Sequence, residues 1–185
     1  MKKVLIIIAI SLFSMYSYGQ LNKGGWIGSF QGSGGAVKYN DYKSSSLKLQ
    51  PSVMYLISNN LALGLNVSTS FESYKLPSVN DIRYNQRSFA LETGPVLRKY
   101  FGSYKLKPYA ELGIGWNYSQ SKSTNYEYLW NDHRLYVKPA LGLSYWISNN
   151  VSIDMNVNYD INAGHSLFRY DDWRLNIGIS VKLGD

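Results

Sequence analysis

The sequence predicts an all-β protein, an eight-stranded antiparallel up-and-down transmembrane β-barrel that follows a cleaved signal peptide. Three features favour this fold class: strict alternation of apolar and polar residues, long strand segments, and connections that alternate in length. Residues 151–161, VSIDMNVNYDI, show the alternation without a break. Because successive side chains of a strand point to opposite faces, this segment has one apolar and one polar face.

The first 19 residues are predicted to be a signal peptide rather than part of the fold. They contain two lysines, an apolar run from Val4 to about Phe13, and small residues before Gln20. The apolar run is well short of the roughly 20 residues that a membrane-spanning helix needs. We therefore expect a signal peptide at residues 1–19 and one barrel domain at residues 20–185.

Composition argues against a nucleic-acid-binding protein and against a fold stabilised by disulfide bonds. Without residues 1–19 the chain has 17 basic and 12 acidic residues, a net charge of +5, but the basic residues are scattered along an exported chain. This distribution argues against a nucleic-acid partner. The chain has no cysteine, so no disulfide can stabilise it after export, and the fold must depend on packing and hydrogen bonds.

Eight segments alternate with period two and are bounded by turn-forming residues. The predicted strands lie near residues 24–34, 45–57, 61–73, 86–100, 105–119, 132–147, 151–163 and 169–183. Each reaches the roughly 9 to 11 residues of a tilted membrane-spanning strand, whereas strands of soluble proteins average about 5 to 6. Strand length therefore favours a barrel that spans a membrane.

Glycine and asparagine delimit the first three segments. Segment 24–34 runs into GSGGAVKY, residues 32–39, which we interpret as the first outer loop because glycine gives a hairpin flexibility. Segments 45–57 and 61–73 are joined by the tight turn Ser58–Asn60. The sequence ISNN at residues 57–60 recurs at residues 147–150, which predicts two equivalent turns in which asparagine adopts a positive φ.

The remaining segments follow with connections that alternate in length. These are the long Tyr74–Asn85, the short Phe101–Tyr104, the long Gln120–Asn131 and the tight Ser148–Asn150. Apolar residues occupy even positions in segment 105–119, such as Trp116, and odd positions in segment 169–183, such as Trp173. Long and short connections therefore lie at opposite rims, as expected for a barrel of the outer membrane.

Three prolines fall inside the second, fourth and sixth predicted strands. Pro51, Pro95 and Pro139 lie on the apolar face of the second, fourth and sixth segments. Proline removes a hydrogen-bond donor from the ladder and usually occupies edges or bulges, but a closed barrel has no edge. We expect β-bulges or locally loosened pairing at these positions.

The polar faces carry charges of both signs, and we expect them to fill the lumen. An eight-stranded barrel has an interior just wide enough for side chains, so no water channel of useful width is predicted. The candidate polar network, with a structural role in register and rigidity, consists of Glu92, Arg98, Glu111, Lys138, Asp154, Asp160 and Arg174. Lys48 and Arg134 share the same polar faces. Pairing of these charges predicts a filled lumen rather than a pore.

Aromatic residues cluster near the strand ends on the side of the long loops. Amphipathic rings favour the headgroup level of a membrane, which predicts an interfacial girdle. Its principal members are Trp116, Tyr118, Trp130, Tyr170 and Trp173, accompanied by Tyr39, Tyr42, Tyr74, Tyr84, Tyr126 and Tyr128.

The chain resembles the small eight-stranded outer-membrane β-barrels of the OmpA/OmpX type, in the stand-alone form found in Bacteroidota. The resemblance rests on this architecture, on the export signal that ends at Gly19-Gln20, and on the last strand, NIGISVKL, residues 176–183. This strand looks like the signal that the barrel-assembly machinery recognises, although the chain ends in Leu183-Gly184-Asp185 rather than in phenylalanine. The resemblance implies a location in the outer membrane.

One group of residues in the sequence is a candidate catalytic site. His165 and Ser166 are followed by Asp171 and Asp172, a combination that some outer-membrane barrels use to modify lipid A. Adjacent residues of a strand point in opposite directions, so His165 and Ser166 could not readily share a hydrogen bond there. His165 and the other histidine, His133, lie in or beside long loops and are interpreted as solvated histidines, and no catalytic, cofactor or metal site is predicted.

We therefore predict a non-enzymatic outer-membrane barrel that acts in envelope structure or surface contact. The expected partners are outer-membrane lipid including lipopolysaccharide, the barrel-assembly machinery, and a surface protein or glycan bound by the outer loops. The segment from Ser119 to Arg134 combines tyrosine, tryptophan, serine and asparagine, a composition suited to such contacts. The alternatives are an outer-membrane lipid-modifying enzyme and a soluble periplasmic ligand-binding barrel.

Overall fold

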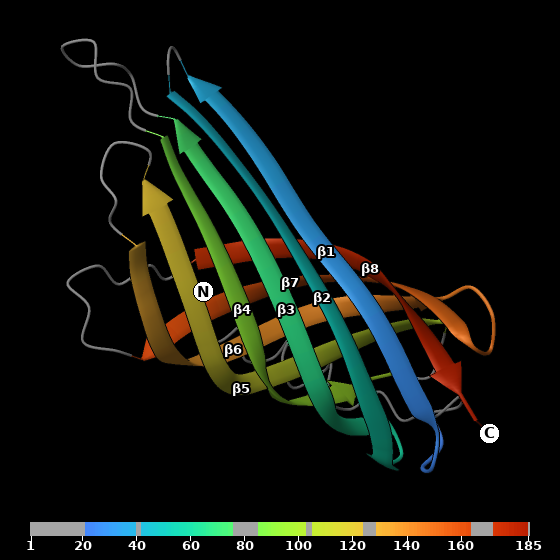
Figure 1. Cartoon of the computed structure of the whole chain (residues 1–185). Coiled ribbons are helices and arrows are strands. Elements are labelled where there is room, and N and C mark those ends of the chain that lie inside the picture. The colour runs from blue at the N-terminus through green and yellow to red at the C-terminus, as the bar shows by residue number, and fades with distance from the viewer. Residues whose placement is uncertain are drawn as a thin grey trace, which may run out of the picture.

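The chain forms a closed barrel of eight antiparallel strands, each paired with its neighbours in sequence and the last paired with the first (Figure 1). The computed structural model describes residues 21–39, 42–75, 85–102, 105–123, 129–163 and 172–184. The strands are β1 (Trp26–Tyr39), β2 (Tyr42–Ser58), β3 (Leu61–Lys75), β4 (Asn85–Tyr100), β5 (Leu106–Ser123), β6 (Leu129–Trp146), β7 (Val151–Ala163) and β8 (Asp172–Leu183). The predicted fold class is confirmed, and the predicted signal peptide lies outside the described residues.

The predicted first outer loop is wrong. Gly32–Tyr39 belongs to β1 and pairs residue by residue with Tyr42–Leu49 of β2. The glycines predict a flexible loop, but cross-strand pairing with β2 keeps this segment extended. β1 and β2 are therefore paired as far as Tyr39 and Tyr42, and both strands reach far toward the rim that carries the long connections. We call this rim the long-loop rim and the opposite one the short-turn rim.

Pro51, Pro95 and Pro139 are accommodated by interrupted pairing rather than by a shift of register. β2 pairs with β3 at Leu49 and again at Ser52 in the same register, with Pro51 in the gap. Equivalent gaps lie at Pro95 between β4 and β5 and at Pro139 between β6 and β7. The expectation of loosened pairing is thus confirmed for all three. The register shift that the structure records lies elsewhere, between Leu56 and Ser58.

Close backbone approach explains two glycines beside one of these gaps. A Cβ atom on Gly94 would collide with the backbone of β5 at Ile114 and Gly115, and one on Gly115 would collide with the backbone of β4 at Thr93 and Gly94. Glycine in a strand commonly marks a bend or a close contact between backbones. The two glycines let β4 and β5 approach where Pro95 has interrupted their ladder.

The two ISNN turns are not equivalent. Asn60 has a φ of 62°, as predicted for a tight hairpin, and its side chain accepts a hydrogen bond from the backbone N–H of Leu21 at 2.8 Å. The second turn is organised by a serine instead. The Oγ atom of Ser148 accepts hydrogen bonds from the backbone N–H groups of Asn150 and Val151 at 3.3 and 3.1 Å.

The polarity of the barrel is inverted relative to a soluble protein. Among the described residues, 21 buried side chains are polar or charged and 11 are hydrophobic. Large apolar side chains cover the outside instead, as Leu141 at 71% exposure and Leu65 at 64% illustrate. Because soluble proteins bury most of their large apolar side chains, this arrangement indicates that lipid rather than water surrounds the wall. No helix in the described part of the chain has the length and apolarity needed to cross a membrane.

The seam between β1 and β8 is shorter than the other strand pairs. It joins Trp26–Gly32 to Ile177–Leu183. In the described residues, Ser33–Tyr39 of β1 pairs with β2 alone, and Asp172–Asn176 of β8 pairs with β7 alone. Figure 1 shows the two strands separating beyond the seam. The wall is therefore least tightly closed between these strands near the long-loop rim.

Candidate functional site

The half of the lumen nearer the long-loop rim contains a buried ion cluster that links four strands. Lys48 on β2 contacts Glu92 on β4 at 3.0 Å and Asp160 on β7 at 3.2 Å. Lys138 on β6 donates to the same Glu92 and lies 3.4 Å from Asp160. All four side chains are at most 10% exposed. We call these four residues the upper ion cluster; it crosses the lumen, because β2 and β6 are four strands apart.

A peripheral pair extends this cluster toward the rim. Arg174 on β8 lies 4.0 Å from Asp160 and 3.0 Å from Glu72 on β3. The hydroxyl of Tyr74 donates to Glu72 at 2.8 Å. With this pair included, three cations face three carboxylates, so the charges in this half of the lumen balance.

A second group, the lower ion cluster, consists of Arg98, Glu111 and Asp154. The guanidinium of Arg98 on β4 donates to Glu111 on β5 at 2.5 Å and to Asp154 on β7 at 3.2 Å. It also lies 4.4 Å from the centroid of the Tyr109 ring, in cation–π geometry. Arg98 is 1% exposed, so its charge is compensated entirely by these neighbours.

Asp154 is the most fully bonded carboxylate of the lower ion cluster. Besides Arg98, it accepts hydrogen bonds from Ser144 at 2.5 Å, Ser152 at 3.0 Å and Ser180 at 2.5 Å. These hydroxyls come from β6, β7 and β8, so one side chain ties three neighbouring strands to β4. Four donors satisfy a carboxylate that has no access to water.

A layer of amides separates the two ion clusters. Asn156 on β7 donates to Gln31 on β1 at 2.8 Å and to the hydroxyl of Tyr109 at 3.1 Å. Asn176 on β8 donates to Asn156 at 2.8 Å. Hydrogen bonds therefore connect β1 with β5, β7 and β8 across the lumen between the clusters.

An apolar plug closes the lumen at the short-turn rim. Its buried members come from strand ends that point into the barrel and from the segment before β1: Leu21, Ile27, Met54, Leu56, Ala62, Val96, Tyr100, Tyr109 and Trp146. Leu21 is held by its reciprocal hydrogen bonds with Asn60. A lumen packed with hydrophobic side chains at one end and ion pairs at the other leaves little room for a continuous column of water.

The structure places all seven predicted network residues inside the barrel and brings them together as two clusters rather than one. Glu92, Lys138, Asp160 and Arg174 lie in or beside the upper ion cluster, and Arg98, Glu111 and Asp154 form the lower one. Arg134 contacts Asp132 on its own strand near the long-loop rim.

The predicted aromatic girdle is placed only in part. Trp116 and Trp173 point outward and are 62% and 70% exposed, and the Trp173 ring lies 4.8 Å from that of Tyr159. Tyr118 lies against His133 on the outer wall, with ring centroids 5.0 Å apart. Tyr170 and the side chain of Trp130 lie outside the described residues, as do the accompanying side chains of Tyr39, Tyr42, Tyr84, Tyr126 and Tyr128. Tyr74 does not belong to the girdle, because it shares the lumen side of β3 with Glu72.

A catalytic group of histidine, serine and carboxylate is not assembled in the described part of the chain. His133 is exposed on the outer wall, where its recorded partner is the Tyr118 ring. Its neighbours on the same face of β6 are Asn131 and Leu135, which provide neither a nucleophile nor an acid. His165, Ser166, Asp171 and the side chain of Asp172 lie outside the described residues.

Sequence reasoning missed the plug and a second set of rim aromatics. Both have a signal in the sequence: the alternation disappears in runs such as VMYLI, residues 53–57, where both faces are apolar. The outward residues of these runs form aromatic contacts at the short-turn rim, as between Trp26 and Tyr55, whose rings lie 5.1 Å apart. The inward ones, Met54 and Leu56, fill the lumen.

Comparisons with known proteins bear on the fold. No protein-family model matches the chain, and no curated protein matches it. Among solved structures, the outer membrane protein OprG from Pseudomonas aeruginosa aligns with a TM-score of 0.57 at 16% identity, covering 93% of this chain and 100% of OprG. Neisserial surface protein A aligns with a TM-score of 0.58 at 16% identity, covering 87% of this chain and 98% of that one.

The N-terminal β-barrel domain of OprF from Pseudomonas aeruginosa is similar as well. It aligns with a TM-score of 0.52 at 13% identity and covers 88% of this chain and 98% of that domain. At these identities the likeness concerns the fold. The chain has the fold of the small eight-stranded outer-membrane β-barrels.

Proposed function

We propose that the protein is a non-enzymatic, non-conducting barrel of the bacterial outer membrane, with a role in envelope structure and in contacts at the cell surface. The observation that carries this proposal is the upper ion cluster. Lys48 and Lys138 come from opposite walls and share Glu92 and Asp160 across the lumen. A solute passing through would have to break several buried ion pairs and then the apolar plug.

The same features support a scaffold rather than a transporter. Hydrogen bonds and ion pairs connect strands that are not neighbours in the wall, which fixes the cross-section of the barrel. A rigid wall of this kind can present loops at a defined position, and the loops between β3 and β4, β5 and β6, and β7 and β8 are the expected sites of surface contact.

Conductance of the wild-type protein in planar bilayers tests the proposal. Folding of the barrel is first verified by a gel mobility that is faster before boiling than after. We expect no steady channel when this folded barrel is reconstituted. A uniform single-channel conductance from the same preparation would contradict a sealed lumen.

Lipid analysis tests the absence of catalysis. Folded protein is incubated with outer-membrane lipid, and the acyl composition of lipid A is followed by mass spectrometry. We expect identical spectra with the wild type, with His133→Ala and without protein. A change of mass that requires folded wild-type protein would instead favour the lipid-modifying enzyme.

A further inference from the structure

The outer wall near the long-loop rim carries rows of side chains that the strand register places side by side. Lys43 on β2 lies directly opposite Lys38 on β1 and opposite Lys75 on β3. All three side chains are exposed. Because adjacent strands are about 4.8 Å apart, the row brings three ammonium groups within reach of one ligand.

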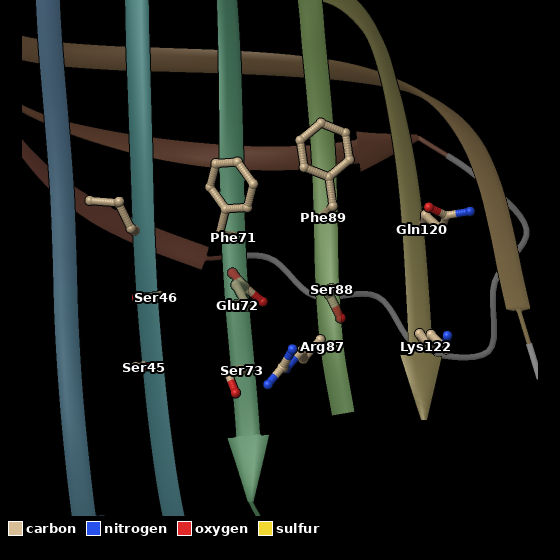
Figure 2. A pocket seen from close by; sticks show the side chains of 11 residues that line it. Ser45, Ser46, Phe71, Glu72, Ser73, Arg87, Ser88, Phe89, Gln120 and Lys122 are labelled. Atoms are coloured by element: carbon tan, nitrogen blue, oxygen red, sulfur yellow. The ribbon is translucent and has the colours of Figure 1, made fainter. Parts of the chain in front are cut away.

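The next row toward the middle of the wall adds hydroxyls and two further cations. It runs from Ser45 on β2 to Ser73 on β3, Arg87 on β4 and Lys122 on β5, each opposite the next. Figure 2 shows the side chain of Arg87 directed toward Ser73. Guanidinium, ammonium and hydroxyl groups are the side chains that bind phosphate oxygens.

The third row is apolar and begins the hydrophobic wall. Leu47, Phe71 and Phe89 lie next to one another on β2, β3 and β4, and the two phenylalanine rings are 5.3 Å apart. Figure 2 shows these rings side by side. A groove of about 440 Å³ runs between the second and third rows, and one of about 350 Å³ lies between the first and second.

Charge in these rows is not balanced by the nearest described carboxylate. Glu72, between Phe71 and Ser73 on β3, also lines the larger groove, but its carboxylate accepts hydrogen bonds from Arg174 and Tyr74 on the lumen side. Like charges directly opposite each other in a sheet are destabilising. Five cations on one face therefore constitute a site that gains stability when an anion occupies it.

The position of the five cations in the wall determines which kind of anion can bind. The cations lie at the level where the apolar wall ends, so a ligand must present negative charge beside acyl chains. We propose that Lys38, Lys43, Lys75, Arg87 and Lys122, together with Ser45 and Ser73, bind the phosphate groups of lipopolysaccharide, while Leu47, Phe71 and Phe89 contact its acyl chains. The proposal rests on the membrane placement in the proposed function. We call these residues the rim site.

Native mass spectrometry of the detergent-solubilised full barrel tests this site with bisphosphorylated lipid A as the probe. The rim variant is Lys43→Gln, Lys75→Gln and Arg87→Gln, and the control variant is Lys23→Gln, Lys99→Gln and Lys105→Gln at the short-turn rim. Both lose three positive charges. We expect roughly tenfold or greater weakening in the rim variant only, because charge-assisted hydrogen bonds are about twice as strong as neutral ones.

Further binding measurements identify which part of the ligand the rim site recognises. Fully dephosphorylated lipid A is expected to bind the wild type roughly tenfold or more weakly than the bisphosphorylated form. Lys43→Arg with Lys75→Arg keeps the charge and is expected to keep the binding. Inorganic phosphate at millimolar concentration is expected not to displace the lipid, since it lacks acyl chains.

Equal binding by the rim and control variants, or by phosphorylated and dephosphorylated lipid A, would overturn the proposal. Displacement by inorganic phosphate would do so too, because the ligand would then be the free anion. Failure of the membrane placement is a separate result: the wild type itself would then show no change of gel mobility on heating.

Discussion

At the scale of single residues, Asp154 shows how one side chain can stabilise the barrel by joining several strands. It is the one carboxylate of the described lumen shown to bind Arg98 together with three serine hydroxyls. Water cannot solvate the charge on Arg98, because its side chain is 1% exposed. Glu111 would still balance the charge on Arg98 if Asp154 became asparagine. The new amide nitrogen would, however, stand where a carboxylate oxygen accepts hydrogen bonds, either from Arg98 and Ser180 or from Ser144 and Ser152, so buried donors would lose their acceptor.

We predict that Asp154→Asn destabilises the folded barrel by about 3 kcal/mol, the order expected when one partner of a buried ion pair is lost. Urea unfolding in lipid vesicles, followed by tryptophan fluorescence, gives this difference. The control is Asp132→Asn, whose ion pair with Arg134 is about one-fifth exposed and should cost less than about 1 kcal/mol. Equal losses would show that the lower ion cluster has no special role.

Gly142 is a second residue with a defined steric role. A Cβ atom there would enter the space of the Tyr109 ring and lie 2.7 Å from the carbonyl oxygen of Met155. Tyr109 in turn holds the amide layer through Asn156. The absence of a side chain at residue 142 thus makes room for a ring that reaches across the lumen.

We predict that Gly142→Ala destabilises the barrel by roughly 1 to 3 kcal/mol through overpacking. Gly113→Ala is the matched control, because its Cβ would be 3.7 Å from the nearest atom. Thermal melting in detergent should show a lower midpoint for Gly142→Ala and an unchanged or slightly higher one for Gly113→Ala. A Gly142→Ala barrel as stable as the wild type would mean that Tyr109 can move aside.

At the scale of strands, the β1–β8 seam is the weakest part of the wall. Its paired stretch ends at Gly32 and Ile177, while β1 continues to Tyr39 with β2 as its only recorded neighbour. Amide groups at such an edge point to solvent or to headgroups rather than to a strand. Local opening follows where backbone hydrogen bonds are few.

We expect faster hydrogen exchange in Ser33–Tyr39 than in Trp26–Gly32, measured by mass spectrometry on barrel in lipid nanodiscs. Lys43–Leu49 on β2 serves as the internal control, because both of its edges are paired, with β1 and β3. Uniform protection along β1 would show that the seam closes fully in a bilayer.

Sequence alternation identified the strands and their two faces, because period two is a local property that each strand shows on its own. It did not identify which residues meet across strands. The five cations of the rim site lie on five strands, and Lys43 lies beside Lys38 and Lys75 only through the register of three strands. Register depends on pairing over the whole ladder, so the two ion clusters and the rim site required the structure.

Glycine gave a wrong prediction, whereas the prediction from proline was correct but incomplete. GSGGAVKY predicted a loop but forms part of β1, since pairing with β2 overrides local flexibility. Proline was interpreted correctly as a disturbance of the ladder, but its form, a gap without change of register at Pro51, depends on both neighbouring strands. Local propensity is a weak guide where tertiary pairing is continuous.

At the scale of the whole molecule, the distribution of polarity decides between a membrane barrel and a soluble one. A soluble ligand-binding barrel would keep apolar side chains inside, whereas here the ion clusters and amides are inside and the apolar belt is outside. Both environments appear among the tryptophans. Trp116 and Trp173 face outward, while Trp146 belongs to the apolar plug and is 5% exposed.

Tryptophan quenching by brominated lipids tests this polarity in the intact barrel. Three single-tryptophan variants retain only Trp116, only Trp173 or only Trp146, with phenylalanine at the other four positions, and each is folded into vesicles whose acyl chains carry bromine. We expect strong quenching of Trp116 and Trp173, because their side chains are exposed on the wall, and little quenching of Trp146, which the barrel shields from lipid. Vesicles without bromine provide the reference intensity for each variant. Stronger quenching of Trp146 than of Trp116 would mean that the apolar wall does not face lipid, and the soluble barrel would then be the better description.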